Sequence, residues 1–371
     1  MTNQEMVDNV LHGYEESCHG ANKPNILVIG PSGAGKSTLI NELFGEEICK
    51  VGSGKPCTDN FVYYDSNPYI NIYDSKGLER DTNIDKFIND VFKFIDTKNG
   101  SIDAEKHTRI ALYCIGEPRL QESDIKLINA ISSKRVMPIL VFTKSDTRSE
   151  EEIAALKKAA GEYKLIMEDV IFTASKKANE KLYEIAPDEI KNGIRQLLER
   201  ILYYTPETDK ISIMAAQEIN TEMKIKAIKK LKDKAKDIVI KYAALAAGGG
   251  AIPIPGPDAL VITELQFKMI GELGAVYNIH VGKEKLAPLL AAFAGVMTAR
   301  QLMKLLPIAG WIISAAIAGT ITGGLGYFCI DRFEKKAVSA AKGEPQEEFD
   351  FDISIEKIME YINSFKASKI L

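Results

Sequence analysis

Residues of the types and spacing needed for phosphate chemistry lie in the first tenth of the chain. The segment GPSGAGKS at positions 30–37 matches the pattern GxxxxGK[S/T], follows a short apolar run and precedes a helical pattern. Its glycines let consecutive backbone N–H groups turn toward phosphate oxygens, and the helix start adds its positive end. Lys36 is expected to reach the β- and γ-phosphates, and the Ser37 hydroxyl to bind Mg²⁺. The predicted phosphate-binding residues are Gly30, Ser32, Gly33, Ala34, Gly35, Lys36, Ser37 and Thr38.

A tetrapeptide farther along the chain predicts which base is bound. Thr143-Lys144-Ser145-Asp146 follows the apolar run 136–142, at the strand end where open α/β sheets bind ligands. The Asp146 carboxylate can accept hydrogen bonds from the N1–H and exocyclic amine of guanine, and the Lys144 stem can pack along the base. Ala174 and Ser175, in Thr173-Ala174-Ser175 after the run 170–172, are predicted to meet the same base. ATP is the alternative if the tetrapeptide matches by accident.

A third motif supplies candidate metal ligands. Asp74-Ser75-Lys76-Gly77 matches DxxG after the apolar segment 69–73. Asp74 is expected to hold Mg²⁺ through water, and the Gly77 N–H to contact the γ-phosphate. Thr58, between the glycine-rich segment and DxxG, is the best candidate to close the metal site. The predicted metal ligands are therefore Ser37, Thr58 and Asp74, and the predicted catalytic residues are Lys36, Thr58 and Gly77.

These motifs, in this order, resemble those of translation-factor-class P-loop GTPases, and the Era-like branch most closely, over about residues 24–203. The segments GSGKPCT, IYDSKGLE and RIALYCI are similar to those of bacterial GTPases labelled ribosome-binding. Only that label suggests the ribosome as a partner. The resemblance implies GTP and GDP as ligands, with Mg²⁺, and hydrolysis of GTP to GDP and phosphate. Leu78 stands where Ras-like enzymes have a water-orienting glutamine, so slow turnover is expected until another group, such as Arg80 of a second copy, contributes.

The elements that must position these motifs alternate between strands and helices. Apolar runs at 26–29, 61–64, 69–73, 109–115, 136–142 and 170–172 predict strands, and helical patterns at 83–97, 121–133, 149–160 and 187–203 separate most of them. This alternation predicts an α/β fold: a three-layer P-loop GTPase domain with a mainly parallel sheet, followed by an all-α domain.

The composition changes beyond Pro206, where alanine, glycine and isoleucine dominate. Residues 206–241 read as one long amphipathic helix with a lysine-rich face, and 353–365 as a last helix. Residues 305–330 carry no charge and contain Gly319 and Gly323 in a GxxxG spacing, which suits either a membrane span or a buried bundle helix. The segments PIPGPDALVITELQFKMI and PIAGWIISAAIAG resemble an uncharacterised helical domain often fused to bacterial GTPases.

The predicted organisation has three parts: an amino-terminal helix and linker at 1–23, a GTPase domain at 24–205 and a helical domain at 206–371. The chain has 371 residues, of which 46% are hydrophobic, and its net charge is −4. This composition excludes wholesale disorder, and the net charge gives no global argument for binding of nucleic acid. The five cysteines form no CxxC pair, which is typical of reduced thiols in a cytosolic protein.

The function expected from these features is a GTP-driven conformational switch whose helical domain serves as an effector or membrane-contact module. Two alternatives stay open: a dynamin-like or immunity-related GTPase that assembles on membranes, and a slow GTP-binding module. The expected partners are guanine nucleotide, a second copy bound through the GTPase domain, and an anionic membrane surface. The expected location is the cytoplasm, with peripheral or integral attachment at the inner face of the cell membrane.

Overall fold

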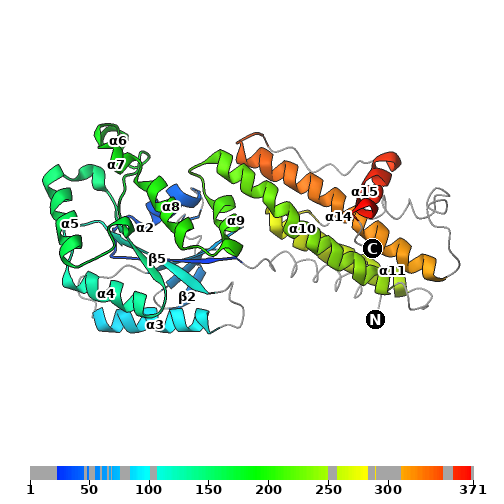
Figure 1. Cartoon of the computed structure of the whole chain (residues 1–371), viewed down its shortest axis with the longest axis horizontal. Helices are drawn as coiled ribbons and strands as arrows, with labels where there is room; N and C mark the ends of the chain where they lie inside the picture. The colour runs from blue at the N-terminus through cyan, green and yellow to red at the C-terminus, as the bar shows by residue number, and fades with distance from the viewer. Residues whose placement is uncertain are drawn as a thin grey trace. The chain divides into compact units, whose positions relative to one another are not determined.

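The computed structural model describes residues 23–45, 48–49, 55–58, 61–64, 67, 69–75, 84–100, 107–249, 257–282, 289, 311–345 and 354–368. It divides into two compact units (Figure 1). The first spans Asn22–Lys224. The second contains Ile225–Leu371 together with Met1–Ala21. The predicted helix and linker at 1–23 falls almost wholly outside the described residues.

The first unit is built on a seven-stranded sheet with the order β2-β3-β4-β1-β5-β6-β7. Strands β4, β1, β5, β6 and β7 run parallel, whereas β3 is antiparallel to β4 and β2 is antiparallel to β3. The strands are β1 (Asn25–Ile29), β2 (Lys55–Thr58), β3 (Phe61–Tyr64), β4 (Asn71–Ser75), β5 (Thr108–Ile115), β6 (Met137–Phe142) and β7 (Val170–Phe172). The mainly parallel α/β fold predicted from the sequence is therefore confirmed.

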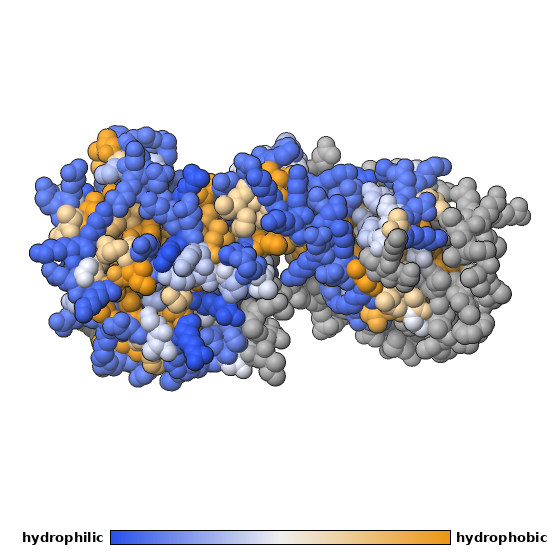
Figure 2. All heavy atoms as spheres, viewed as in Figure 1, coloured by the Kyte–Doolittle hydropathy of each residue, from blue (hydrophilic) through white to orange (hydrophobic). Residues whose placement is uncertain are grey.

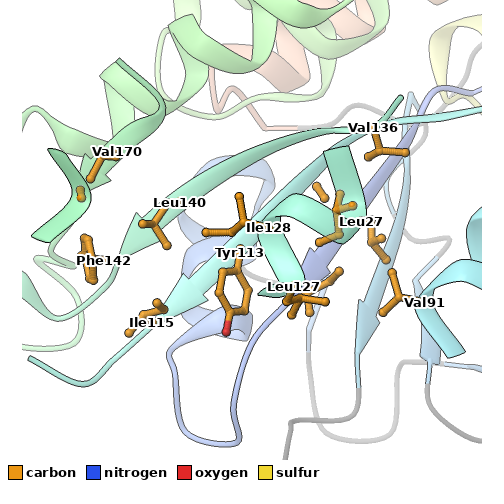
Figure 3. Close-up of a cluster of buried hydrophobic side chains, with 14 of the residues drawn as sticks. Leu27, Val91, Tyr113, Ile115, Leu127, Ile128, Val136, Leu140, Phe142 and Val170 are labelled. Carbon is orange, nitrogen blue, oxygen red and sulfur yellow. The ribbon is translucent and has the colours of Figure 1, made fainter. Parts of the chain in front are cut away.

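Helices cover both faces of this sheet, so its central strands are apolar throughout rather than alternating. Leu27 and Tyr113 belong to the cluster that packs against α3 (Ile84–Asn99) and α4 (Glu122–Ser133), as Figure 3 shows. The intervening strand residues, such as Leu112, are equally buried. Further helices of this unit are α2 (Lys36–Phe44), α5 (Glu150–Glu162), α6 (Glu180–Ile185), α7 (Asp188–Lys191), α8 (Gly193–Tyr204) and α9 (Glu207–Ala216).

Several elements differ from the sequence-based expectation: β4 is Asn71–Ser75 rather than 69–73, and the helix expected at 187–203 is two helices, α7 and α8. Residues 55–58 form the edge strand β2, which the apolar pattern missed because Lys55, Pro56 and Thr58 are not strand-forming apolar residues. The long helix expected at 206–241 is two helices, α9 and α10 (Thr221–Gly249). Between them lies Gln217, which is fully buried. Its Nε2 donates to the Met214 and Asn220 carbonyls, and its Oε1 accepts from two backbone N–H groups.

This break lies within the first unit, whose last residue, Lys224, is already in α10. The Glu218 N–H donates to the Leu43 carbonyl at 2.8 Å, and the Asn67 side-chain amide donates to the Ala216 carbonyl at 3.3 Å. These contacts attach α9 and the following turn to helix α2 and to the connection between β3 and β4. The compact units consequently divide at residue 224/225, beyond the predicted boundary at 205/206.

The second unit consists of packed helices, of which the described ones are α10, α11 (Pro257–Tyr277), α14 (Trp311–Ala341) and α15 (Ile355–Ala367). Glycines let α14 approach its neighbours closely. A Cβ atom at Gly319 would lie 2.8 Å from the Ala243 carbonyl oxygen of α10, and one at Gly323 would lie 2.3 Å from the Phe365 ring of α15. The GxxxG spacing therefore serves packing against two other helices of the same chain.

Polar contacts also connect these helices. Gln266 of α11 donates to Thr322 of α14 at 3.1 Å inside the unit, and Tyr361 of α15 donates to Asp331 of α14 at 2.8 Å. Hydrophilic residues cover much of the described surface on the face shown in Figure 2. Among the described residues, no helix combines the length and apolarity required to cross a membrane. Residues 305–310 of the uncharged stretch lie outside the described part of the chain.

Candidate nucleotide-binding site

The glycine-rich segment joins β1 to α2 at the carboxyl end of the parallel strands. Gly30 has a φ of +151°, and a Cβ atom there would lie 2.2 Å from the Cys114 carbonyl oxygen of β5. Only glycine fits this close approach of two neighbouring strand ends. The backbone then turns through left-handed conformations at Gly33 and Gly35 before α2 begins at Lys36. The loop therefore has the backbone shape that phosphate binding requires.

Lys36 is the buried cation of this loop. Its ammonium donates to the Gly30 carbonyl at 2.9 Å and to the Pro31 carbonyl at 3.0 Å, and the side chain is 8% exposed. Ser32, Gly33, Ser37 and Thr38 are exposed at the mouth of the loop and at the start of α2. Lys36 thus lies under the loop and the polar groups predicted to meet phosphate are open to a ligand.

Thr143 connects the base motif to the phosphate loop across 109 residues of sequence. Its hydroxyl donates to the Ala34 carbonyl at 2.5 Å, and its N–H donates to the Ile115 carbonyl at 3.0 Å. The Lys144 ammonium donates to the Gly33 carbonyl at 2.8 Å, while the Lys144 backbone takes the left-handed conformation with φ 54°. The two predicted motifs are therefore parts of one site, joined by side-chain contacts with the loop backbone.

Asp146 is half-buried beyond this connection, and burial is the main cause that raises the pKa of its carboxyl group. Arg148 stabilises this turn through hydrogen bonds. Its guanidinium donates to the Ser145 hydroxyl at 2.7 Å and to the Glu117 carbonyl at 3.3 Å. Sequence reasoning missed Arg148, because nothing in the motif specifies an arginine two residues after the aspartate. Arg148 therefore connects the turn that contains Asp146 to the residues that follow β5.

A pocket of about 210 Å³ opens between the base motif and α2. Asp146 and Lys144 line one side, and Ala174 and Ser175 line another. Gly35, Thr38, Leu39 and Glu42 contribute the wall from α2, at the i, i+3, i+4, i+7 spacing of one helix face. The structure therefore brings every residue predicted to meet the base into one cavity. Glu42, which the sequence did not single out, lies there too, with its carboxylate accepting a hydrogen bond from the Ser175 hydroxyl.

Asp74 is the residue before the last one of β4, at the same end of the sheet, and is 7% exposed. Its Oδ1 has no hydrogen-bond partner among the described residues. Burial raises the pKa of Asp74 from 3.8 to about 6, and the charge of Lys36 acts in the opposite direction. A buried carboxylate oxygen without a partner is suited to a ligand that the protein itself does not supply.

The remaining predicted site residues are only partly visible. Gly77, together with Leu78 and Arg80, lies outside the described residues. The backbone of Thr58 ends β2, where Thr58 pairs with Phe61 of β3, and Phe61 pairs with Ser75 of β4. Thr58 is thus placed near the carboxyl-end edge of the sheet by its backbone, while its side chain is outside the described part of the structure.

Comparisons with known proteins match both units. Residues 25–144 match the family described as 50S ribosome-binding GTPase, and residues 214–348 match a domain of unknown function, DUF697. GTPase Era of Borrelia hermsii is 29% identical over 247 residues, covering 60% of this chain and 78% of Era. The amino-terminal unit therefore contains a domain that matches the GTPase family model and is similar to Era, and a DUF697 domain follows it in the same chain.

Two Der proteins are also similar to the Era-like domain. GTPase Der of Sulfurihydrogenibium sp. is 23% identical over 184 residues, covering 48% of this chain and 37% of Der. GTPase Der of Fusobacterium nucleatum is 28% identical over 139 residues, covering 36% of this chain and 30% of Der. The chain therefore spans about a third of the length of these two relatives.

Among solved structures, a dimerisation-deficient mutant of Toc33 from Arabidopsis thaliana is similar to the chain. It is 18% identical, and the match covers 46% of this chain and 78% of Toc33 with a TM-score of 0.29.

Proposed function

We propose that the chain binds GTP at the site between the P-loop and Asp146, hydrolyses it to GDP and phosphate, and uses the exchange as a conformational switch. The observation that carries this proposal is the pair of contacts from Thr143 and Lys144 to the P-loop backbone. They join a phosphate-binding loop to a half-buried carboxylate with the acceptor pattern that guanine requires. Hydrolysis is expected to be slow because Leu78, the residue after DxxG, has no group that can orient water.

Mg²⁺ fits the chemistry of the residues present. The orphaned Asp74 oxygen and the exposed Ser37 hydroxyl are oxygen ligands, which this cation prefers, and the site needs few side chains when phosphates and water complete the coordination. When bound, the ion would neutralise charge on the β- and γ-phosphates. Lys36 contributes a second positive charge from within the loop, and the P-loop backbone orients the phosphate chain.

A cluster of buried amides connects the GTPase domain to the residues that lead into helix α10. Asn67 is 5% exposed, and its Nδ2 donates to the Phe44 carbonyl at the end of α2 and to the Ala216 carbonyl at the end of α9. Helix α2 begins at Lys36, in the nucleotide site, and α10 begins five residues after α9. A shift of α2 on nucleotide exchange would therefore act directly on the start of α10. We infer that this cluster transmits the change at the nucleotide site to α10 and so forms the output of the switch.

The nucleotide specificity is tested by Asp146→Asn. The amide can no longer accept both hydrogen bonds from the guanine edge, so we expect GDP affinity to fall by about 100-fold, or roughly 3 kcal/mol. The variant should instead favour xanthine nucleotides, whose carbonyl the amide can donate to. Isothermal titration calorimetry of wild type and variant with GDP, XDP and ADP measures this. Equal affinities of the wild-type protein for ATP and GTP would overturn the assignment.

The switch output is tested by Asn67→Ala, with Asn192→Ala as control because the Asn192 side chain is exposed and bonds only within its own turn. Hydrogen–deuterium exchange of α10 is compared between GDP and a non-hydrolysable GTP analogue. We expect wild type and Asn192→Ala to show a nucleotide-dependent difference in α10. In Asn67→Ala this difference should disappear, while GDP affinity stays within about threefold. An unchanged α10 response in Asn67→Ala, with nucleotide still bound, would rule out this output.

A further inference from the structure

The base pocket contains a contact that the motifs do not account for. Glu42 lies on α2, 133 residues before Ser175, and its Oε1 accepts a hydrogen bond from the Ser175 hydroxyl. The same hydroxyl accepts a hydrogen bond from the Ala178 N–H at 3.2 Å. Ser175 therefore links its own turn to the helix that begins at the phosphate loop.

Other hydrogen bonds hold the segment around Ser175 at its two ends. At its start, the Thr173 N–H donates to the Phe142 carbonyl at 2.8 Å, and the Thr173 carbonyl accepts from the Ser145 N–H at 2.9 Å. At its end, Asn179 bonds back to Ser175 and caps α6 through the Leu182 N–H. The next residue, Lys176, is exposed and pairs with Glu180 and Glu184 of α6. Among these contacts, the Glu42–Ser175 hydrogen bond is the one that joins the segment to α2.

We propose that Glu42 is a positioning residue of the nucleotide site, which holds the segment 173–178 closed against α2 and so sets the lifetime of bound guanine nucleotide. This inference rests on the proposed GTP binding. Ser175 has a short side chain, and its hydroxyl reaches the carboxylate of Glu42 across the pocket wall. A hydrogen bond to an ionised acceptor is stronger than a neutral one, so its loss is expected to be measurable.

Glu42 also gives the pocket lining a second carboxylate besides Asp146. Guanine presents N–H donors along the edge that Asp146 meets, and the ribose presents hydroxyl donors. A wall with two carboxylates favours such a donor-rich ligand and disfavours bases that present acceptors. Opening of the segment would remove Ala174 and Ser175 from this wall together.

The test measures dissociation of the fluorescent analogue mant-GDP from the full chain in the presence of Mg²⁺. Glu42→Ala is expected to raise the dissociation rate by about tenfold, and Ser175→Ala by a similar factor. Glu42→Gln keeps an acceptor oxygen and should stay within about threefold of wild type. Because both alanine variants break the same hydrogen bond, the double variant should dissociate no faster than either single variant. Lys176→Ala, next to Ser175 but outside the pocket, is the matched control and should not change the rate.

The outcomes separate this inference from the proposed function. If wild type releases mant-GDP slowly and Glu42→Ala does so at the same rate, Glu42 has no positioning role, although GTP binding stands. Rate increases that multiply in the double variant would likewise contradict a shared hydrogen bond. If Glu42→Gln raises the dissociation rate of mant-GDP as much as Glu42→Ala does, the acceptor oxygen at position 42 is not what slows nucleotide release. Failure of the wild-type protein to bind mant-GDP at all would overturn both proposals. The melting temperatures of the nucleotide-free variants should equal that of wild type, which distinguishes positioning from general destabilisation.

Discussion

Replacement of Lys36 by alanine is expected to reduce the affinity for GTP and GDP by at least about 100-fold, or roughly 3 kcal/mol. Lys36 supplies the positive charge within the loop that surrounds the phosphates, and its ammonium is already held there by the carbonyls of Gly30 and Pro31. Without it, the phosphate oxygens lose a charge-assisted partner in a partly desolvated place. Asp74 also loses the nearby charge that lowers its pKa, so it becomes harder to ionise.

Calorimetric titration with GDP and with a non-hydrolysable GTP analogue, both with Mg²⁺, measures this effect. Lys158→Ala is the matched control, because the Lys158 side chain is 80% exposed on α5 and belongs to no part of the site. The control should bind as wild type does. An affinity of Lys36→Ala within about threefold of wild type would show that the P-loop backbone binds the phosphates without this side chain.

Replacement of Asp74 by asparagine is expected to have opposite effects on stability and on function. In the nucleotide-free protein, burial raises the Asp74 pKa from 3.8 to about 6. Because the pKa of Asp74 in the folded protein lies above its value in the unfolded chain, protonation of Asp74 stabilises the folded protein. This contribution is fully present below pH 4 and is lost as the pH rises through about 6. The loss corresponds to roughly 3 kcal/mol above pH 7. An amide at position 74 avoids the cost of a buried charge, but it cannot serve Mg²⁺ as a carboxylate does.

We therefore expect nucleotide-free Asp74→Asn to be more stable than wild type at pH 7.5 by about 1–3 kcal/mol, which raises the melting temperature by roughly 2–10 °C. At pH 4 the two proteins should melt at nearly the same temperature. Addition of GTP and Mg²⁺ should stabilise wild type strongly and the variant weakly. Thermal unfolding at both pH values, with and without ligand, measures these differences.

Asp188→Asn, an exposed carboxylate on α7, is the control for loss of one negative charge. It should leave the melting temperature and the response to GTP unchanged. If nucleotide-free Asp74→Asn has a lower melting temperature than wild type at pH 7.5, the buried Asp74 carboxylate does not destabilise the nucleotide-free protein. That result would contradict its interpretation as a group kept available for Mg²⁺.

Much of the nucleotide site could be predicted from sequence because its chemistry depends on neighbouring residues. The P-loop, the base motif and DxxG are each contiguous, and a parallel sheet brings the carboxyl ends of their strands to one edge. The strands β1, β3, β5, β6 and β7 were predicted nearly to the residue, since strands covered on both faces are continuous apolar runs. The edge strand β2 lacks such a run and was missed.

Features that depend on side chains distant in sequence were decided only by the tertiary structure. No local pattern indicates that Glu42 would meet Ser175, or that Arg148 would support the base-binding turn. The break between α9 and α10 was also missed, because helical periodicity continues through Gln217 and only its burial against the preceding and following turns shows why the helix stops.

The apolar carboxyl-terminal half shows the same limit. Uncharged, glycine-containing helices satisfy the sequence requirements of a membrane span and of a tightly packed bundle alike. In the described part of α14, Gly319 and Gly323 lie against α10 and α15. The sequence by itself was enough to predict which residues bind phosphate and guanine, because that prediction depends on local backbone shape and side-chain chemistry. The tertiary structure decided which surfaces are covered and which groups distant in sequence meet, because burial and long-range contacts exist only once the elements have packed together.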